Sequence, residues 1–203
     1  MGKKWLILII AVLLGVNVFM LFHFQQLRQR YNFVLQEFVI NSELHSLKVS
    51  FSASIENSNF KLEDVSVRDS LGNTLLLSDI LSNKPKYVLV CRFSELHCES
   101  CIYFAVQFIR HSVDLIGAEN IVLLGSYRNN RVFSRTMYSY GVHNLNFYNV
   151  GALTLPAERD RYPYYFILNR DLTVSNVFFP DRTTPSTTER YLRAINRRFF
   201  ENR

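Results

Sequence analysis

Hydrophobic residues follow three different patterns along this chain, and the first is an unbroken run near the start. Residues 5–22 (WLILIIAVLLGVNVFMLF) contain Asn17 as their only strongly polar member. At about 1.5 Å per residue, a helix of this length reaches about 27 Å, close to the hydrocarbon thickness of a bilayer. The run continues into the polar segment QQLRQR without the small-residue site at which signal peptides are cleaved. This pattern predicts one uncleaved transmembrane helix over residues 1–24.

The second pattern is a helical repeat of apolar residues directly after this run. Residues of one helix face recur at spacings of three and four, and here they are Phe24, Leu27, Tyr31, Val34 and Phe38. Two interpretations stay open. The repeat is either a seam that joins two copies of the chain into a homodimer, or a short amphipathic stalk that lies on the folded domain or on the bilayer.

A stretch rich in Ser and Asn follows the helical repeat. Residues 50–59 (SFSASIENSN) show only weak periodicity, which is typical of a linker or an exposed loop. We therefore expect a helical stalk and linker over residues 25–59 and a folded domain over residues 60–203.

The third pattern covers residues 60–203, where short apolar segments alternate with one-sided helical segments. Residues 87–93 (YVLVCRF) have almost no polar face until Arg92, which is typical of a central strand covered on both sides. The order β-β-β-α-β-α-β-β-β-α predicts an α/β fold with a mixed sheet and helices on both faces. Strands are expected at residues 65–67, 75–77, 87–93, 121–125, 144–148, 164–168 and 174–179, and helices at residues 101–116, 130–140 and 188–200.

Charge adds little to this picture. The chain carries 23 Lys and Arg against 17 Asp and Glu, a formal net charge of +6. Much of the excess lies on the C-terminal helical segment, where a solvated helix face near a lipid surface explains it. No nucleic-acid recognition motif accompanies the basic residues, so we expect no nucleic-acid partner.

The candidate chemistry lies in HCESC, residues 97–101, between a buried strand and the start of a helix. A thiolate at a helix N-terminus is stabilised by free backbone N–H groups and by the helix dipole, which lowers its pKa from about 8.5 toward neutrality. The spacing brings the second sulfur within reach of the first. We therefore expect Cys98 to be the attacking thiolate and Cys101 the resolving thiol that closes an intramolecular disulfide.

With this motif in place, residues 60–203 resemble the thioredoxin-like superfamily, in particular membrane-tethered (TlpA/ResA-like) redoxins of bacterial cell envelopes. The segments that carry the resemblance are VSVRDSLGNTLLLSDIL, KPKYVLVCRFSELHCESC and YPYYFILNRDLTVSNVFFP. The resemblance implies a thiol-disulfide oxidoreductase without a further cofactor, anchored in a bacterial inner membrane by one span with its C-terminal domain in the periplasm. Its partners would be protein thiols or disulfides of the envelope, which it would reduce, and an upstream membrane electron donor.

The resemblance also assigns residues around the dithiol. Pro163 stands where the family places a cis-proline, so the resemblance implies a cis Tyr162–Pro163 bond whose backbone pairs with the substrate. His97 stands where many members carry Trp, next to the docking edge. It would favour the thiolate if protonated, but an exposed residue without a role is an equal alternative.

Two other departures concern acid groups. Glu99 and Ser100 replace the family's Gly-Pro pair, and Glu99 beside Cys98 should disfavour the thiolate. Cys91 or Arg92 stands where thioredoxin keeps a buried acidic residue. Proton transfer would then need a substitute, for which Glu95 and Glu99 are the candidates.

Four alternatives remain open beside the oxidoreductase. A zinc site would use Cys91, His97, Cys98 and Cys101, but the second half-site is missing, and Cys91 in a buried strand is more typical of a core residue, so we expect no metal. A structural Cys98–Cys101 disulfide would close too short a loop to stabilise much. A peroxidase would need Thr or Ser where Glu95 stands. Finally, a tethered thioredoxin-like domain could serve as a non-catalytic binding or sensing module.

Overall fold

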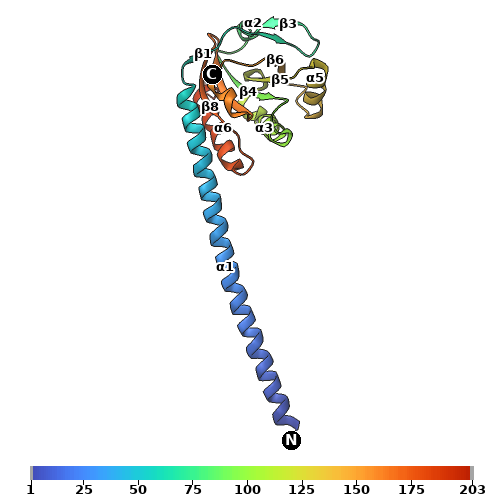
Figure 1. The fold of residues 1–203 in the computed structure, drawn as a ribbon, viewed down its shortest axis with the longest axis vertical. Helices are drawn as coiled ribbons and strands as arrows, with labels where there is room; N and C mark the ends of the chain where they lie inside the picture. The colour runs from blue at the N-terminus through green and yellow to red at the C-terminus, as the bar shows by residue number, and fades with distance from the viewer. Residues whose placement is uncertain (1, 202–203) are drawn as a thin grey trace. The chain divides into compact units, whose positions relative to one another are not determined.

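The chain forms two compact units, residues Met1–Ser42 and Glu43–Arg203, and each is described by itself. The structure, a computed structural model, describes residues 2–201, apart from the side chains of residue 4 and residues 6–12. One helix, α1 (Gly2–Glu56), supplies the described part of the first unit and the start of the second. The second unit contains all the strands of the described chain (Figure 1).

The first unit is helical along its described length. The helix predicted over the apolar repeat of residues 24–38 is confirmed, while its pairing with a second copy stays a prediction. No helix in the described part of the chain is both long and apolar enough to cross a membrane. The transmembrane helix predicted over residues 1–24 falls partly on residues 4 and 6–12, and this part of the prediction lies outside the described side chains.

The linker predicted over residues 50–59 is wrong, because α1 continues through most of it to Glu56. Small or polar residues at spacings of three and four, Ser46, Ser50, Ala53 and Asn57, are buried on one side of this segment. Such residues let a helix approach its neighbours closely, but they carry no apolar signal that a hydrophobic pattern would detect. The polar composition of this stretch therefore indicated a linker, although one side of it is a buried helix face.

The second unit is built on one eight-stranded mixed sheet with the order β1-β8-β7-β4-β5-β6-β2-β3. The central strands β4, β5 and β6 run parallel to one another, and the remaining neighbours pair antiparallel. The predicted mixed sheet is thus confirmed, with the two-residue β1 as an addition. The strands are β1 (Phe60–Lys61), β2 (Ser66–Arg68), β3 (Thr74–Leu76), β4 (Tyr87–Ser94), β5 (Ile121–Ser126), β6 (Asn146–Val150), β7 (Tyr164–Asn169) and β8 (Thr173–Phe178).

Helices cover both faces of this sheet, as predicted. One apolar cluster joins one face of β4 to α3, α5 and α6, and a second joins the opposite face to α2 and to Ala53 of α1. The single helix predicted over residues 101–116 is divided at Ser112 into α3 and α4. The bounds are α2 (Leu77–Ser82), α3 (Glu99–His111), α4 (Val113–Ile116), α5 (Asn130–Ser139) and α6 (Pro185–Phe199), with short 3-10 turns η1 (Ala118–Asn120) and η2 (Pro156–Asp160).

The alternation of side chains along β4 determines on which face of the sheet Arg92 lies. Cys91 belongs to the cluster on the α3 face, whereas Val90 belongs to the cluster on the opposite face. Arg92 therefore points to the face opposite α3, because successive side chains of a strand alternate. Its side chain is only 1% exposed, so a guanidinium lies buried close to the end of the strand that leads to HCESC.

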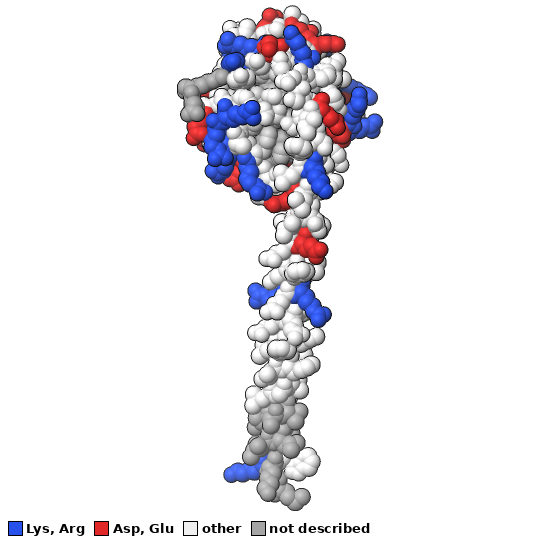
Figure 2. All heavy atoms as spheres, turned by 90° about the vertical axis from the view of Figure 1, so that its left-hand side faces the viewer, with Lys and Arg blue, Asp and Glu red and all other residues white. Residues whose placement is uncertain are grey.

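The surface of the second unit carries charges of both signs. Figure 2 shows Lys and Arg interspersed with Asp and Glu over the visible face of this unit. Part of the basic excess on α6 is neutralised locally, since Arg190 lies 3.3 Å from Glu43 and Arg193 lies 2.6 Å from Glu189. The arginines of α6 are therefore partly engaged within the protein.

Candidate active site

The motif HCESC lies in the turn between β4 and α3. After Ser94, the last residue of β4, the backbone N–H of His97 donates to the Ser94 carbonyl at 2.9 Å and closes a tight turn. Cys98 is the residue that precedes the first turn of α3, and its carbonyl accepts from the N–H groups of Cys101 and Ile102 at 2.9 and 3.0 Å. The predicted placement of Cys98 at the opening of a helix is confirmed.

The two thiols of the motif have different surroundings. Cys98 is exposed, and its Sγ lies 3.1 Å from Ser100 Oγ. Hydrogen bonds from Ser100 and from the Cys101 thiol lower the pKa of Cys98 to about 7. Burial raises the pKa of Cys101, and its hydrogen bond to Cys98 raises it further. Near pH 7 the accessible Cys98 is therefore about half ionised, and the Cys101 thiol beside it is protonated.

A pocket of about 640 Å³ opens beside the two sulfurs. The last turns of α1 form one wall through His45, Ser46 and Val49. The volume falls within the range that small ligands or a short peptide segment occupy. The other lining residues come from the segments before β7 and after β8: Asp160, Tyr162, Phe179, Pro180, Asp181, Arg182 and Thr183.

Arg182 connects the far wall of this pocket to the motif. It lies in the loop between β8 and α6, and its Nη1 donates to Ser100 Oγ at 2.8 Å. Its positive charge acts to lower the pKa of Cys101, against the larger effect of burial. Neither Arg182 nor Ser100 carries a signal in the sequence, because they lie 82 positions apart and belong to no common motif.

The two glutamates expected to assist proton transfer have other partners. Glu95 Oε1 accepts from the Arg128 backbone N–H at 3.2 Å and lines a separate cavity of about 420 Å³. Glu99 is exposed in the first turn of α3. Burial raises the pKa of Tyr127 and Tyr140, and the charge of Glu99 adds to this effect. Of the residues that the structure describes, neither glutamate lines the pocket beside the cysteines, and their role in proton transfer stays a prediction.

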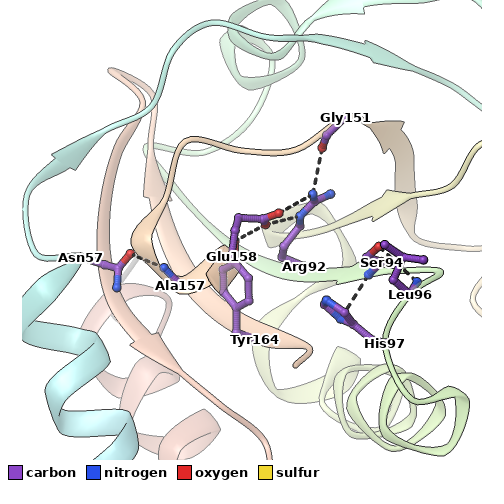
Figure 3. A network of polar contacts seen from close by, with 9 residues as sticks. All are labelled: Asn57, Arg92, Ser94, Leu96, His97, Gly151, Ala157, Glu158 and Tyr164. Carbon is purple, nitrogen blue, oxygen red and sulfur yellow. Dashed lines mark hydrogen bonds and ion pairs between the residues drawn. The ribbon is translucent and has the colours of Figure 1, made fainter. Parts of the chain in front are cut away.

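His97 has its side chain turned toward the buried arginine. Its Nδ1 accepts from the Ser94 backbone N–H at 3.3 Å (Figure 3). Burial and the nearby charge of Arg92 lower the pKa of His97, against an opposing effect of Glu158. The imidazole is therefore neutral at pH 7 and does not supply the positive charge that would favour the Cys98 thiolate.

Comparison with known proteins adds a fold to this geometry. No family model matches the chain, and no curated protein matches it. A putative electron transfer protein from Aquifex aeolicus VF5 superposes with a TM-score of 0.50 at 12% identity, covering 71% of this chain and 97% of that chain. The fold is thioredoxin-like.

Two further solved structures share smaller likenesses with the chain. The thioredoxin domain of a thiol-disulfide oxidoreductase from Bacteroides vulgatus gives a TM-score of 0.47 at 14% identity, over 66% of this chain and 97% of that one. The peroxidoxin BcpB from Mycobacterium tuberculosis gives a TM-score of 0.49 at 14% identity, over 70% of this chain and 97% of that chain.

The thioredoxin-like fold places Pro163 at the start of β7, but the expected cis bond is wrong. No cis peptide bond occurs in the described part of the chain. The Tyr162–Pro163 bond is trans, the lower-energy form of a bond before proline, and Arg161 before it adopts a left-handed backbone with φ 55°. Pro163 itself is buried, while Tyr162 is 59% exposed and lines the pocket.

The buried guanidinium of Arg92 has a carboxylate partner. Glu158 of η2 brings its carboxylate to the Arg92 guanidinium, with Nε–Oε1 2.7 Å and Nη2–Oε2 3.0 Å. The Tyr164 hydroxyl donates to the same carboxylate at 2.7 Å (Figure 3). Sequence reasoning missed Glu158, although a lone arginine in an apolar strand is a signal that a buried carboxylate must lie nearby.

Cys91 takes no part in the chemistry of the pair. It is fully buried in the cluster on the α3 face, and burial raises the pKa of its thiol. Among the described residues no group of three or more His, Cys, Asp or Glu side chains is arranged to hold a metal ion. The predicted core role of Cys91 is thus confirmed.

Proposed function

We propose that this protein is a thiol-disulfide oxidoreductase that reduces disulfides through Cys98 and Cys101. The observation that carries the proposal is the asymmetry of the pair: an exposed Cys98 with a pKa of about 7 beside a half-buried Cys101 with a raised pKa. An attacking thiol works best when its pKa lies near the ambient pH, and a resolving thiol must stay protonated until the first step is complete.

The reaction then runs in two exchanges. The Cys98 thiolate attacks one sulfur of the substrate disulfide, forms a mixed disulfide and releases the other sulfur as a thiolate. Cys101 loses its proton, attacks the Cys98 sulfur and releases the second substrate thiolate. Two electrons pass from the dithiol to the substrate, and the protein is left with a Cys98–Cys101 disulfide, which an electron donor must reduce again.

The pocket supports a polypeptide substrate. Its volume of about 640 Å³ and its open position beside Cys98 fit a short segment around a cysteine. Tyr162 and the backbone before β7 offer a docking edge next to the sulfur, as the resemblance to thioredoxin-like proteins implies. His97 faces Arg92, so we assign it no contact with substrate.

We further propose that the protein acts at a membrane in a bacterial envelope, anchored by residues 5–22. The apolar run of these residues and the resemblance to tethered redoxins support this location. An integral anchor resists extraction by alkaline carbonate, whereas a peripheral protein is released. Retention of the full chain, together with protease access to residues 43–203 from the periplasmic side, is the expected result, and release into the supernatant would contradict it.

A trapping experiment tests the oxidoreductase proposal. In Cys101→Ser the mixed disulfide cannot be resolved, so Cys98 should accumulate adducts with envelope proteins that a reductant releases. Cys98→Ser/Cys101→Ser is the matched control and should form none. A companion titration in glutathione or dithiothreitol buffers should show one reversible two-electron transition between about −180 and −300 mV. Absence of Cys98-dependent adducts together with absence of this transition would favour a non-catalytic binding module.

A further inference from the structure

Arg182, from the loop between β8 and α6, hydrogen-bonds to the segment between the two cysteines. Its Nη1 lies 2.8 Å from Ser100 Oγ, and Ser100 Oγ lies 3.1 Å from Cys98 Sγ. The three side chains therefore form a chain from the β8–α6 loop to the candidate nucleophile, and Ser100 lies in the middle of it.

The chemistry of the three groups fixes the direction of both hydrogen bonds. A guanidinium has only donors, so Ser100 Oγ must accept from Arg182. A serine hydroxyl has one hydrogen, which remains available for the neighbouring sulfur. A thiolate can only accept, so the Ser100 hydrogen points at Cys98 when Cys98 is ionised. With Arg182 donating to its oxygen, the hydroxyl is also polarised, which strengthens its donation to the sulfur.

The loop that carries Arg182 is held in place by its own contacts. Asp181 Oδ1 accepts from both the backbone N–H and the hydroxyl of Thr183 at 2.8 Å, and the Asp181 carbonyl accepts from Thr184 N–H at 3.1 Å. Pro180 and Pro185 flank the loop and fix their own φ angles. The backbone of this loop thus has few accessible conformations, and it holds Arg182 next to Ser100 although the Arg182 side chain is exposed.

We propose that Arg182 is a positioning residue that acts through Ser100 to hold Cys98 in its ionised, attacking form. This inference rests on the proposed function and deepens it. It assigns the reactivity of the pair partly to a loop more than eighty positions away from it. Other titratable or charged groups face or adjoin the sulfurs and remain unchanged in the test: His45, Asp160, Tyr162, Asp181, Cys101, His97 and Glu99.

The test is the pH profile of Cys98 alkylation by iodoacetamide in the reduced full chain, with the rate read at the Cys98 peptide by mass spectrometry. In Arg182→Gln the rate at pH 6 should fall about threefold to tenfold, because a smaller fraction of Cys98 is ionised. The rate above pH 10 should not fall, because a more basic thiolate is intrinsically the better nucleophile. A purely structural defect would not move the profile along the pH axis in this way.

Ser100→Ala should give the same change, and the double variant should add nothing further, because Arg182 acts on Cys98 only through Ser100. Ser100→Ala leaves the loop intact, so the test holds even if Arg182→Gln disturbs it. Arg197→Gln, an exposed arginine of α6 with no part in the site, is the matched control and should keep the original profile.

Three results would overturn the inference: an unchanged profile in Arg182→Gln, an equal loss of rate at every pH, or additive effects in the double variant. Failure of the proposed function is a separate result. It would appear in the unmodified and Cys101→Ser proteins as the absence of the two-electron transition and of Cys98-dependent adducts, whatever the alkylation profiles of the Arg182 and Ser100 variants.

Discussion

Cys98 and Cys101 are three residues apart, yet their surroundings move their pKa values in opposite directions. The position of Cys98 before α3 was predictable, since an apolar strand followed by a helical pattern places the motif at a helix start. Arg182, the hydrogen-bond donor to Ser100, was not predictable from the sequence. Ser100 has no signal of its own, and Arg182 comes from a loop that only the folded sheet brings alongside.

The Arg92–Glu158 pair is the second residue-scale feature, and its charge balance leads to a stability prediction. Burial raises the pKa of Glu158, but the hydrogen bond and the charge of Arg92 outweigh it, so the folded pKa lies below the ordinary 4.5. Glu158→Gln leaves the guanidinium of Arg92 buried without its counter-charge. We expect the free energy of unfolding at pH 7 to fall by about 3–5 kcal/mol, measured by urea denaturation.

The stability difference between Glu158→Gln and the parent should depend on pH. A carboxyl group with a lowered folded pKa stabilises the protein above its unfolded pKa, and the benefit is lost as the pH falls through the folded value. The difference between Glu158→Gln and the parent should therefore shrink below about pH 4.5. Glu189→Gln, which removes an ion pair to the 65% exposed Arg193, is the control and should cost at most about 1 kcal/mol. Equal losses in the two variants would contradict the prediction.

At the scale of elements, β5 and α5 meet at a glycine whose lack of a side chain is required. A Cβ added at Gly125 would lie 2.2 Å from Cε2 of Phe133, whose ring is fully buried among Phe93, Tyr127 and Phe147. Gly125→Ala should therefore force the ring to shift and lower the free energy of unfolding by about 1–3 kcal/mol.

Denaturant unfolding of two further variants tests whether the contact with the Phe133 ring causes the loss of stability. Phe133→Leu in the Gly125→Ala background should recover part of the loss, because the smaller side chain leaves room for the new methyl group. Gly151→Ala, where nothing lies within 4 Å of the added Cβ, should stay within about 0.5 kcal/mol of the parent. A Gly125→Ala protein as stable as Gly151→Ala would show that α5 moves without cost.

The elements that sequence reasoning found are those with a strong apolar period. β4 was predicted as a central strand and lies between β5 and β7. The strands predicted at residues 164–168 and 174–179 are present as the antiparallel neighbours β7 and β8. The end of α1 was missed because its buried face consists of Ser46, Ser50, Ala53 and Asn57. A face of small and polar residues is visible only once the surface that covers it is known.

At the scale of the whole molecule, this missed helix end shifts the boundary of the stable unit from residue 60 to residue 43. Asn57 Oδ1 accepts from the Ala157 N–H at 3.2 Å, and Glu43 accepts from the Ser186 hydroxyl at 2.7 Å. A fragment of residues 60–203 loses both contacts and the α1 wall of the pocket. We expect it to be less stable than residues 43–203 by at least about 2 kcal/mol.

Urea unfolding of the two purified fragments measures this difference directly. Residues 43–203 should unfold in one transition at the higher midpoint, because the segment 43–56 packs on the sheet as part of the same core. Equal midpoints would mean that this segment contributes nothing to stability and that the boundary near residue 60 was adequate.

The Arg92–Glu158 pair also shapes the electrochemistry of the cysteine centre. Below the pKa of Cys98, reduction of the Cys98–Cys101 disulfide takes up two electrons and two protons, so the reduction potential falls by about 59 mV for each pH unit. Above the pKa of Cys98 the reduction takes up only one proton, and the potential falls by about 30 mV for each pH unit. Because Arg92 keeps Glu158 ionised throughout this range, no buried acid adds a proton of its own. The bend in the curve, at about pH 7, then reports Cys98 alone, and the driving force of the centre follows the ionisation of a single sulfur atom.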